Sequence, residues 1–266
     1  MKKYEGYLIC TDFDGTFALP NAELSDENLE AVRDFQANGG LFTIASGRTP
    51  TFIRELGDRF RPNAPVIAMN GAVLCDESDG HVLRRFPMSR DVLAIMDDIA
   101  ATGLPRRMSL WNEYEIRDDW TREDGVLPSA RFKSLPEPWF KTVVTADPES
   151  TLKIRDYFLA RYAERFNCGR SWPEGFEIHS LESGKGECMR ALREMYGGRI
   201  HTTIGVGDYE NDLSLVRDAD IGYAVGNAID EVKAVARRVT VPNTQHAIAR
   251  IIAELPVIVD APCHCE

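Results

Sequence analysis

The chain has 266 residues, 44% of them hydrophobic and 27% charged, which is enough to bury a sizeable core in one large or two moderate domains. Its formal net charge of −11 argues against nucleic acid as a general partner, because a phosphate backbone requires a basic surface. The six cysteines are scattered, and there is neither a signal peptide nor an apolar run of the roughly 18–20 residues that cross a bilayer, so we expect a cytoplasmic protein without a membrane partner.

The first predicted strand, Tyr7–Thr11, ends in two carboxylates. The run is short and apolar and lacks a helical period, which is typical of a buried parallel strand. Asp12 and Asp14 follow it, ahead of Gly15, which lets the backbone turn sharply. Ligands bind at the carboxyl ends of strands in open α/β sheets, and two acids placed there without cations are electrostatically costly. The pattern therefore indicates a metal site and a reaction, against the alternative of an ordinary Asp-rich turn.

A second apolar strand, Leu41–Ala45, ends in Ser46, Gly47 and Arg48. The serine hydroxyl and the free backbone N–H groups of such a turn can hold phosphate oxygens. A plain strand-to-helix turn explains the same residues, and Arg48 has the further alternative of a structural ion pair.

Residues 83–183 belong to none of the predicted parallel strands. This block contains its own strand, Thr142–Val144, and a helix that starts at Asp147-Pro148 and continues to Phe166. We interpret it as a second α/β domain, which covers the rest of the chain as a cap. The remaining residues, 1–82 and 184–266, then form one discontinuous core domain.

The inserted block holds two groups of candidate substrate contacts. Its tryptophans either stack on a substrate or form the core and interface of the block itself. Its polar residues are equally well explained as surface charge. The tryptophans are Trp111, Trp120, Trp139 and Trp172, and the polar candidates are Arg106, Arg107, Glu177 and His179.

Lys185 lies between two glycines at the start of a predicted helix, Glu187–Met195. An ammonium group at a helix N-terminus opposes the helix dipole, so an anionic partner there would be favourable. The alternative is a solvated surface lysine.

A third strand, Thr202–Val206, ends in Gly207 and Asp208, with Asn211 and Asp212 shortly after. The turn can bring Asp208 and Asp212 to one metal ion while the Asn211 amide faces a substrate. Acids in the first turn of the following helix are favourable in any case, which is the alternative reading.

Strand and helix patterns alternate along both ends of the chain, with helix caps such as Ser25 and Gly39. This alternation predicts a doubly wound parallel sheet. The predicted strands are Tyr7–Thr11, Leu41–Ala45, Val66–Met69, Thr202–Val206 and Tyr223–Val225, and the predicted helices run from Ser25 to Gly39, from Thr51 to Phe60 and from Glu187 to Met195.

Taken in order, these motifs resemble those of the haloacid dehalogenase-like phosphohydrolase superfamily. The order matches an Asp-x-Asp-Gly-Thr motif at Asp12, a Ser after a strand at Ser46, a Lys at Lys185 and a Gly-Asp-x-x-Asn-Asp motif at Gly207. Within the superfamily the chain resembles the Cof-type group, subclass IIB. The resemblance implies a Rossmann-like, doubly wound parallel-sheet core with an inserted α/β cap domain.

The resemblance also implies a mechanism. Asp12 is expected to attack phosphorus and form an aspartyl-phosphate, while Asp14 protonates the leaving oxygen and then deprotonates water. Mg²⁺ is the expected cofactor, and its expected ligands are a side-chain oxygen of Asp12, the backbone carbonyl of Asp14, Asp208, and Asp212 either directly or through water. The groups expected to hold the phosphoryl oxygens are Ser46, the Gly47 backbone, Lys185 and Asn211.

The expected partner is a small phosphorylated metabolite, either a sugar phosphate or a phosphorylated cofactor, and the expected assembly is a monomer or a weak homodimer. Two other functions stay open at this point. The first is a phosphotransferase or phosphomutase, in which a sugar hydroxyl replaces water as the acceptor. The second is a non-catalytic sensor of phosphorylated ligands.

Overall fold

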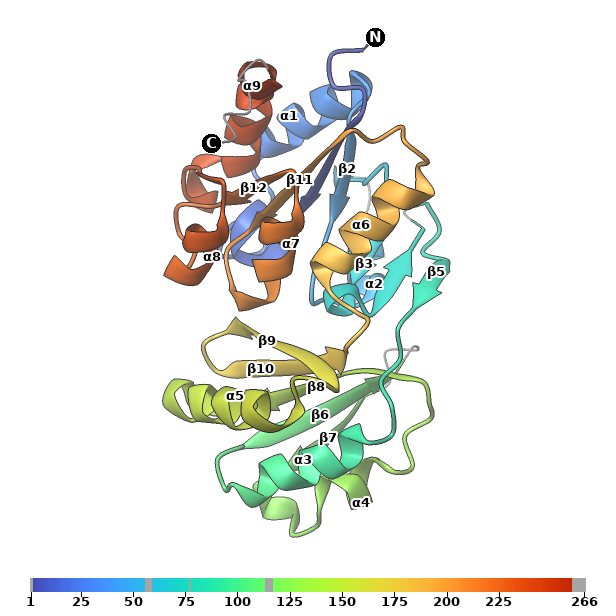
Figure 1. Cartoon of the computed structure of the whole chain (residues 1–266), viewed down its shortest axis with the longest axis vertical. Helices are drawn as coiled ribbons and strands as arrows, with labels where there is room; N and C mark the ends of the chain where they lie inside the picture. The colour runs from blue at the N-terminus through green and yellow to red at the C-terminus, as the bar shows by residue number, and fades with distance from the viewer. Residues whose placement is uncertain (1, 56–58, 77, 113–116, 260–266) are drawn as a thin grey trace.

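The computed structural model describes residues 2–55, 59–76, 78–112 and 117–259. The chain forms two parts, one above the other in Figure 1. The upper part, which we call the parallel part, contains both the beginning and the end of the described chain. The lower part, which we call the antiparallel part, is formed by the middle of the chain. None of the helices in the described ranges has the length and apolar character needed to cross a membrane.

The parallel part is built on a five-stranded sheet in the order β13-β12-β11-β1-β2, and all four strand pairs are parallel. This confirms the predicted parallel sheet. Its strands are β1 (Tyr7–Thr11), β2 (Leu41–Ile44), β11 (Thr202–Gly207), β12 (Ile221–Ala224) and β13 (Arg238–Val239).

Helices cover both faces of this sheet, which explains why β1 is buried throughout. Tyr7 and Ile9 of β1 pack in the hydrophobic cluster that includes α1 and α9, whereas Leu8 and Cys10 pack in the cluster that includes α6. The helices of this part are α1 (Asp26–Ala37), α2 (Pro50–Glu55), α6 (Lys185–Met195), α7 (Leu213–Asp218), α8 (Asp230–Val235) and α9 (Ala247–Val259). The predicted helix over residues 51–60 is present as α2 over Pro50–Glu55; residues 56–58 of that prediction lie outside the described residues, and Phe60 is not helical.

The predicted strand at Val66–Met69 is present as β3, but it belongs to a separate antiparallel sheet, β3-β4-β5. It still joins the end of β2 through a parallel bridge between Ile67 and Ala45, and Oγ1 of Thr43 donates to the Pro65 carbonyl. Met69 and Asn70 have φ values of 51° and 56°, so the chain turns back on itself there instead of crossing to a parallel neighbour. The strands of this small sheet are β3 (Val66–Ala68), β4 (Val73–Cys75) and β5 (Val82–Arg85). The boundary that we expected after residue 82 falls inside β5.

The antiparallel part contains a second five-stranded sheet, in the order β7-β6-β8-β10-β9. One face of this sheet packs against helices through side chains such as Met108, Val144 and Phe176, and the residues that alternate with these face the parallel part. Its strands are β6 (Arg107–Asn112), β7 (Arg117–Thr121), β8 (Trp139–Thr145), β9 (Phe166–Trp172) and β10 (Gly175–Ser180), and its helices are α3 (Val92–Ala101), α4 (Pro128–Phe132) and α5 (Pro148–Tyr162).

The helix predicted from Asp147-Pro148 to Phe166 is present as α5, but it is four residues shorter at its C-terminal end. It ends at Tyr162, where Arg165 closes a turn onto the Tyr162 carbonyl. Phe166 instead begins β9 and packs in the cluster between the second sheet and its helices. An apolar residue at this position is compatible with a helix or with a strand, so the sequence pattern does not distinguish the two. The packing of Phe166 in this cluster favours the strand.

Candidate functional site

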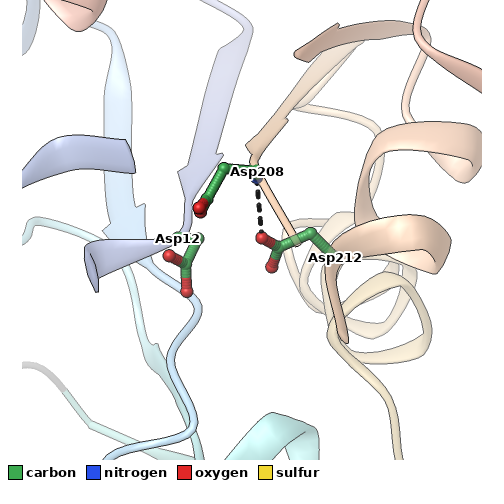
Figure 2. A group of neighbouring side chains, drawn as sticks. All are labelled: Asp12, Asp208 and Asp212. Atoms are coloured by element: carbon green, nitrogen blue, oxygen red, sulfur yellow. Dashed lines mark hydrogen bonds between the residues drawn. The ribbon is translucent and has the colours of Figure 1, made fainter. Parts of the chain in front are cut away.

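The acids of two predicted motifs meet because β1 and β11 are neighbours in the parallel sheet. Thr11 is paired with Val206, so Asp12 and Asp208 follow directly at adjacent strand ends. Figure 2 shows these two side chains with that of Asp212, which comes from the turn before α7. One carboxylate oxygen of each of the three lies within 4.8 Å of the other two.

Gly15 allows this close arrangement. It has a φ of 78°, and a Cβ at this position would lie 2.5 Å from Oδ2 of Asp208. Thr16, the next residue, donates a hydrogen bond from Oγ1 to Oδ1 of Asp208 at 2.7 Å. The turn after β1 therefore both approaches and orients the acid that follows β11.

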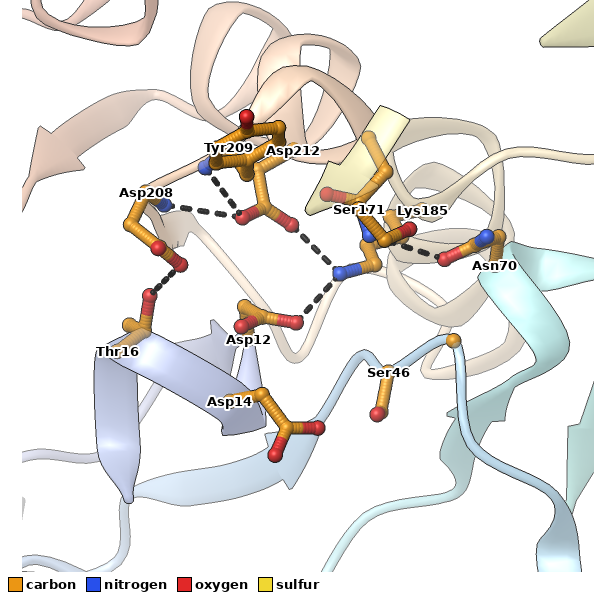
Figure 3. Close-up of polar contacts among 12 residues, drawn as sticks. Asp12, Asp14, Thr16, Ser46, Asn70, Ser171, Lys185, Asp208, Tyr209 and Asp212 are labelled. Carbon is orange, nitrogen blue, oxygen red and sulfur yellow. Dashed lines mark hydrogen bonds and ion pairs between the residues drawn. The ribbon is translucent and has the colours of Figure 1, made fainter. Parts of the chain in front are cut away.

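Lys185 links two of the three acids, as Figure 3 shows. Its Nζ donates to Oδ1 of Asp12 and to Oδ1 of Asp212, at 2.6 Å in each case, and its side chain is completely buried. The helix that we expected to begin at Glu187 begins at Lys185 itself. Lys185 is thus a buried member of the acidic cluster and not a solvated surface lysine.

Asp212 uses both of its carboxylate oxygens inside the protein. Oδ1 accepts from Lys185, and Oδ2 accepts from the backbone N–H groups of Asp208 at 2.9 Å and Tyr209 at 3.3 Å. Asp212 therefore holds the loop that carries Asp208 in place.

The three acids are crowded enough to raise the pKa values of Asp12 and Asp208. Burial raises the pKa of Asp12 well above its usual value, Asp212 adds to the rise, and Lys185 opposes it. Burial and the neighbouring Asp212 raise the pKa of Asp208 to about 7. Three carboxylates and one ammonium group carry a formal charge of −2 (−3 + 1) when all are ionised. An all-oxygen donor set with this charge fits a hard divalent cation.

The carboxylate of Asp14 lies apart from this cluster. Arg48 holds it in a two-fold ion pair, with Nε donating to Oδ2 at 2.7 Å and Nη2 donating to Oδ1 at 2.6 Å. The guanidinium carbon of Arg48 also lies 3.8 Å from the ring centre of Phe52. Of the two alternatives for Arg48, the structure therefore shows the ion pair, and its partner is Asp14.

Ser46 and Asn211 are joined through a residue whose role the sequence did not indicate, Asn70. The backbone N–H of Asn70 donates to the Ser46 carbonyl at 2.9 Å, and Nδ2 of Asn211 donates to Oδ1 of Asn70 at 3.2 Å. Oγ of Ser46 accepts from the backbone N–H of Arg48 at 3.1 Å. Asn70 and Gly71 both have positive φ values, as is typical of an Asn-Gly pair in a turn.

A cavity of about 810 Å³ lies between the two parts of the chain and reaches this site. Asp12, Asp14, Gly47, Asp208 and Asn211 line it from the parallel part. Ser46, Lys185 and Asp212 are not among its lining residues, and all three are buried.

The face of the second sheet that looks toward the parallel part forms the opposite wall of the cavity. Of the four polar candidates, Arg107 and Glu177 line it, whereas Arg106 and His179 do not. The tryptophans divide in the same way, because Trp111 and Trp172 line the cavity. Trp120 and Trp139 are buried in the hydrophobic cluster of the antiparallel part.

Polar contacts join the two parts on both sides of the cavity. Lys141 donates from Nζ to the Gly47 carbonyl at 2.7 Å and to Oε1 of Glu177 at 2.8 Å, and Oε2 of Glu177 accepts from Nδ2 of Asn70 at 2.5 Å. On the other side, Glu210, two residues after Asp208, accepts from the guanidinium groups of Arg155 and Arg170. Lys141 and Glu210 were not among the sequence candidates, because nothing in a sequence marks contacts between distant elements.

His179 gives the protein a testable acid sensitivity, although it does not line the cavity. Burial lowers the pKa of His179 to about 4, below the 6.5 of an exposed histidine. Between about pH 6.5 and 4, His179 is therefore protonated in the unfolded chain but not in the folded chain. The free energy of unfolding falls as the pH drops through this range. The full loss corresponds to about 3 kcal/mol in the free energy of unfolding.

Urea unfolding of His179→Gln across this pH range is expected to show less of this loss than the wild type does. His81→Gln, at an exposed histidine, is the matched control and is expected to follow the wild type. Equal acid sensitivity of all three proteins would contradict the prediction.

Comparisons with known proteins agree with this geometry. A family model described as haloacid dehalogenase-like hydrolase matches residues 9–252. The chain is 26% identical to the 5-amino-6-(5-phospho-D-ribitylamino)uracil phosphatase YcsE of Bacillus subtilis, over 92% of this chain and 94% of that protein. It is 27% identical to the pyridoxal phosphate phosphatase YbhA of Escherichia coli, over 92% of this chain and 97% of that protein. A solved haloacid dehalogenase-like hydrolase from Bacillus subtilis has the same fold, with a TM-score of 0.78 and 20% identity over 93% of this chain and 99% of that one.

Proposed function

This chain belongs to the haloacid dehalogenase-like hydrolase family and to its Cof-type group, and we propose that it is a Mg²⁺-dependent phosphatase that hydrolyses small phosphate monoesters through an aspartyl-phosphate intermediate. The observation that carries the proposal is the position of Asp12, which is buried, lines the cavity and is held by Lys185 beside two further acids. The substrates named for the two relatives are both phosphorylated small molecules, which supports sugar phosphates or phosphorylated cofactors as the substrate class.

The proposed metal ligands are Asp12, Asp208 and the backbone carbonyl of Asp14. Asp212 is proposed to act through water or by holding the Asp208 loop, because both of its oxygens already accept hydrogen bonds. Bound Mg²⁺ would neutralise the negative charge that Asp12 and the phosphoryl group bring together.

The chemistry assigned to the side chains proceeds in two steps. An oxygen of Asp12 forms a bond to phosphorus while the bond from phosphorus to the leaving oxygen breaks, and Asp14 gives that oxygen a proton. Water then attacks phosphorus, its proton returns to Asp14, and the Asp12 carboxylate is regenerated as inorganic phosphate leaves. Arg48 orients Asp14 for both proton transfers through the two-fold ion pair.

Four groups are proposed to hold the phosphoryl oxygens: the Ser46 hydroxyl, the Gly47 backbone N–H, the Lys185 ammonium group and the Asn211 amide. The hydrogen bonds through Asn70 support this assignment for Ser46 and Asn211, since they keep the two residues at one side of the site. A fixed set of donors stabilises the charge of the transition state without reorganisation.

We also propose that residues 83–183 act as a cap over a core of residues 1–82 and 184–266. The contacts of Lys141 and Glu177 with Gly47 and Asn70 support this role, because they close the cavity over the proposed phosphate site. A closed cap excludes bulk water and selects the leaving group. A reducing, cytoplasmic location is supported by the buried thiols of Cys10 and Cys188, neither of which is in a disulfide.

Removing the metal is expected to stop the reaction. Phosphate release from a panel of sugar phosphates and pyridoxal 5′-phosphate is measured with Mg²⁺, with EDTA, and with Mg²⁺ added back in excess. We expect EDTA to lower the rate at least about 100-fold and Mg²⁺ to restore it, because the acidic cluster then regains its counter-charge. Hydrolysis that EDTA leaves unchanged would contradict the proposed cofactor. Transfer of phosphate to an added sugar, without release of inorganic phosphate, would favour the phosphotransferase alternative.

A further inference from the structure

Among the residues whose side chains the structure describes, the cavity wall that belongs to the second sheet carries four charged side chains, arranged as two ion pairs. Arg107 and Ser109 of β6 lie opposite Thr121 and Asp119 of β7, and β8 and β10 bring Lys141 and Glu177 into the same wall. Arg107 is paired with Asp119, and Lys141 is paired with Glu177. The formal charge of these four described side chains is therefore zero (+2 − 2).

Lys141 and Glu177 neutralise each other and are buried, so neither is available to bind a charged ligand. Their side chains are 8% and 3% exposed, and Nζ of Lys141 donates to both Glu177 and the Gly47 carbonyl. Glu177 also accepts hydrogen bonds from Asn70 and Ser171. Burial alone would raise the pKa of Glu177, but the charge of Lys141 and these hydrogen bonds hold it below its usual value, so Glu177 stays ionised. Separating such a pair would leave a buried charge without compensation.

The other two cationic side chains that line the cavity in the described part of the chain, Arg107 and Arg48, are also in ion pairs. Nη2 of Arg107 donates to Oδ2 of Asp119 at 2.5 Å, and Arg48 holds Asp14 as described above. Among the described lining residues, every lysine and arginine thus has a carboxylate partner. The other residues that line this wall in the described part of the chain are uncharged, and Trp111, Trp172 and Val143 are the apolar ones.

We propose that the cavity selects phosphate monoesters whose leaving group carries no second anionic group. This inference rests on the proposed phosphatase function. A carboxylate or a second phosphate on the leaving group would have to displace Asp119 or Glu177 from its cation, or lie in the cavity beside five acids (Asp12, Asp14, Asp119, Glu177 and Asp208). A neutral leaving group with hydroxyls or a ring neither breaks an ion pair nor is repelled by these acids.

The test compares phenyl phosphate with 4-carboxyphenyl phosphate, which differ by one carboxylate on the same ring. We expect kcat/KM of the wild type to be at least about tenfold higher for phenyl phosphate, although the carboxylated phenol is the better leaving group. Asp119→Asn releases Arg107 from its partner and is expected to narrow this ratio by about tenfold. Asp119 is chosen over Glu177 because its partner Arg107 is about half exposed, whereas Lys141, the partner of Glu177, is buried and would be left as an unpaired buried charge.

Asp118→Asn is the matched control, because it removes the same charge one residue away. Asp118 pairs with Arg131 at 3.1 Å and does not line the cavity. It is expected to keep the wild-type ratio. Equal kcat/KM for the two esters in the wild type, or an equal change of the ratio in both variants, would overturn the proposal.

Binding of the same two esters to Asp12→Asn, measured by titration calorimetry with Mg²⁺ present, separates this inference from the proposed function. A weaker affinity of Asp12→Asn for the carboxylated ester supports the selection. If the wild type hydrolyses neither ester, the phosphatase function is contradicted, but the selection is not. Equal affinities combined with efficient hydrolysis of both esters would contradict the selection alone.

Discussion

Asp12→Asn is expected to lower the rate of phosphate release by at least about 10⁴-fold while the protein stays folded. An amide oxygen is a poor nucleophile, so the aspartyl-phosphate cannot form at a useful rate. The fold is expected to tolerate the change, because Asn has nearly the same shape and burial already raises the pKa of Asp12 in the free protein. Lys185 also keeps Asp212 as an ionic partner. Steady-state phosphate release and thermal unfolding, each with and without Mg²⁺, are the measurements.

The control for this prediction is again Asp118→Asn, which removes a carboxylate of the antiparallel part that does not line the cavity. It is expected to keep the rate within about threefold of the wild type, as for most surface substitutions away from a site. An Asp12→Asn protein that is folded, binds Mg²⁺ and still hydrolyses its substrate at the wild-type rate would contradict the assignment of Asp12 as the nucleophile.

Lys185→Met is expected to cause the largest loss of stability among the site variants. The substitution leaves Asp12 and Asp212 buried without the ammonium group that now donates to both at 2.6 Å. Breaking a buried ion pair by removing one partner costs about 3–5 kcal/mol in the free energy of unfolding. Urea unfolding in EDTA measures this loss, and Mg²⁺ is expected to recover part of it because the ion compensates the same carboxylates.

A double substitution keeps the Lys185 prediction testable if the single variant does not fold. Lys185→Met combined with Asp12→Asn removes one negative charge along with the positive one, and it is expected to be more stable in EDTA than Lys185→Met alone. Phosphate release is expected to be lost in both. A single variant as stable as the wild type in EDTA would show that Lys185 does not compensate the acids.

The site was predictable where one strand carries its own signal. The run Tyr7–Thr11 is mostly apolar because helices cover both faces of the parallel sheet. The acids that follow it mark where the buried strand ends. Asp12 and Asp208 could be expected to meet once both were placed at the ends of parallel strands. Lys185 was predicted for a role at the site, but only the fold shows that it is fully buried between Asp12 and Asp212.

The cavity wall was less predictable, because a two-residue period only separates one face of a strand from the other. The sequence proposed Arg106, Arg107, Glu177 and His179 without distinguishing them, and two of these line the cavity. Lys141 was missed, although it pairs with Glu177 and touches the Gly47 carbonyl. The tryptophans show the same limit, since Trp111 and Trp120 lie on neighbouring strands and only Trp111 lines the cavity.

By itself, the sequence determined the parallel sheet, the position of the acids at its strand ends and the family, because local hydrophobic patterns and short motifs carry this information. Only the tertiary structure decided which charges are paired: Arg48 with Asp14, Glu177 with Lys141, and Glu210 with Arg155 and Arg170. The partners in these pairs are separated by more than thirty residues and come from different elements. Ion pairing depends on distance and burial, which the packing of sheets and helices sets and which no local pattern of residues encodes.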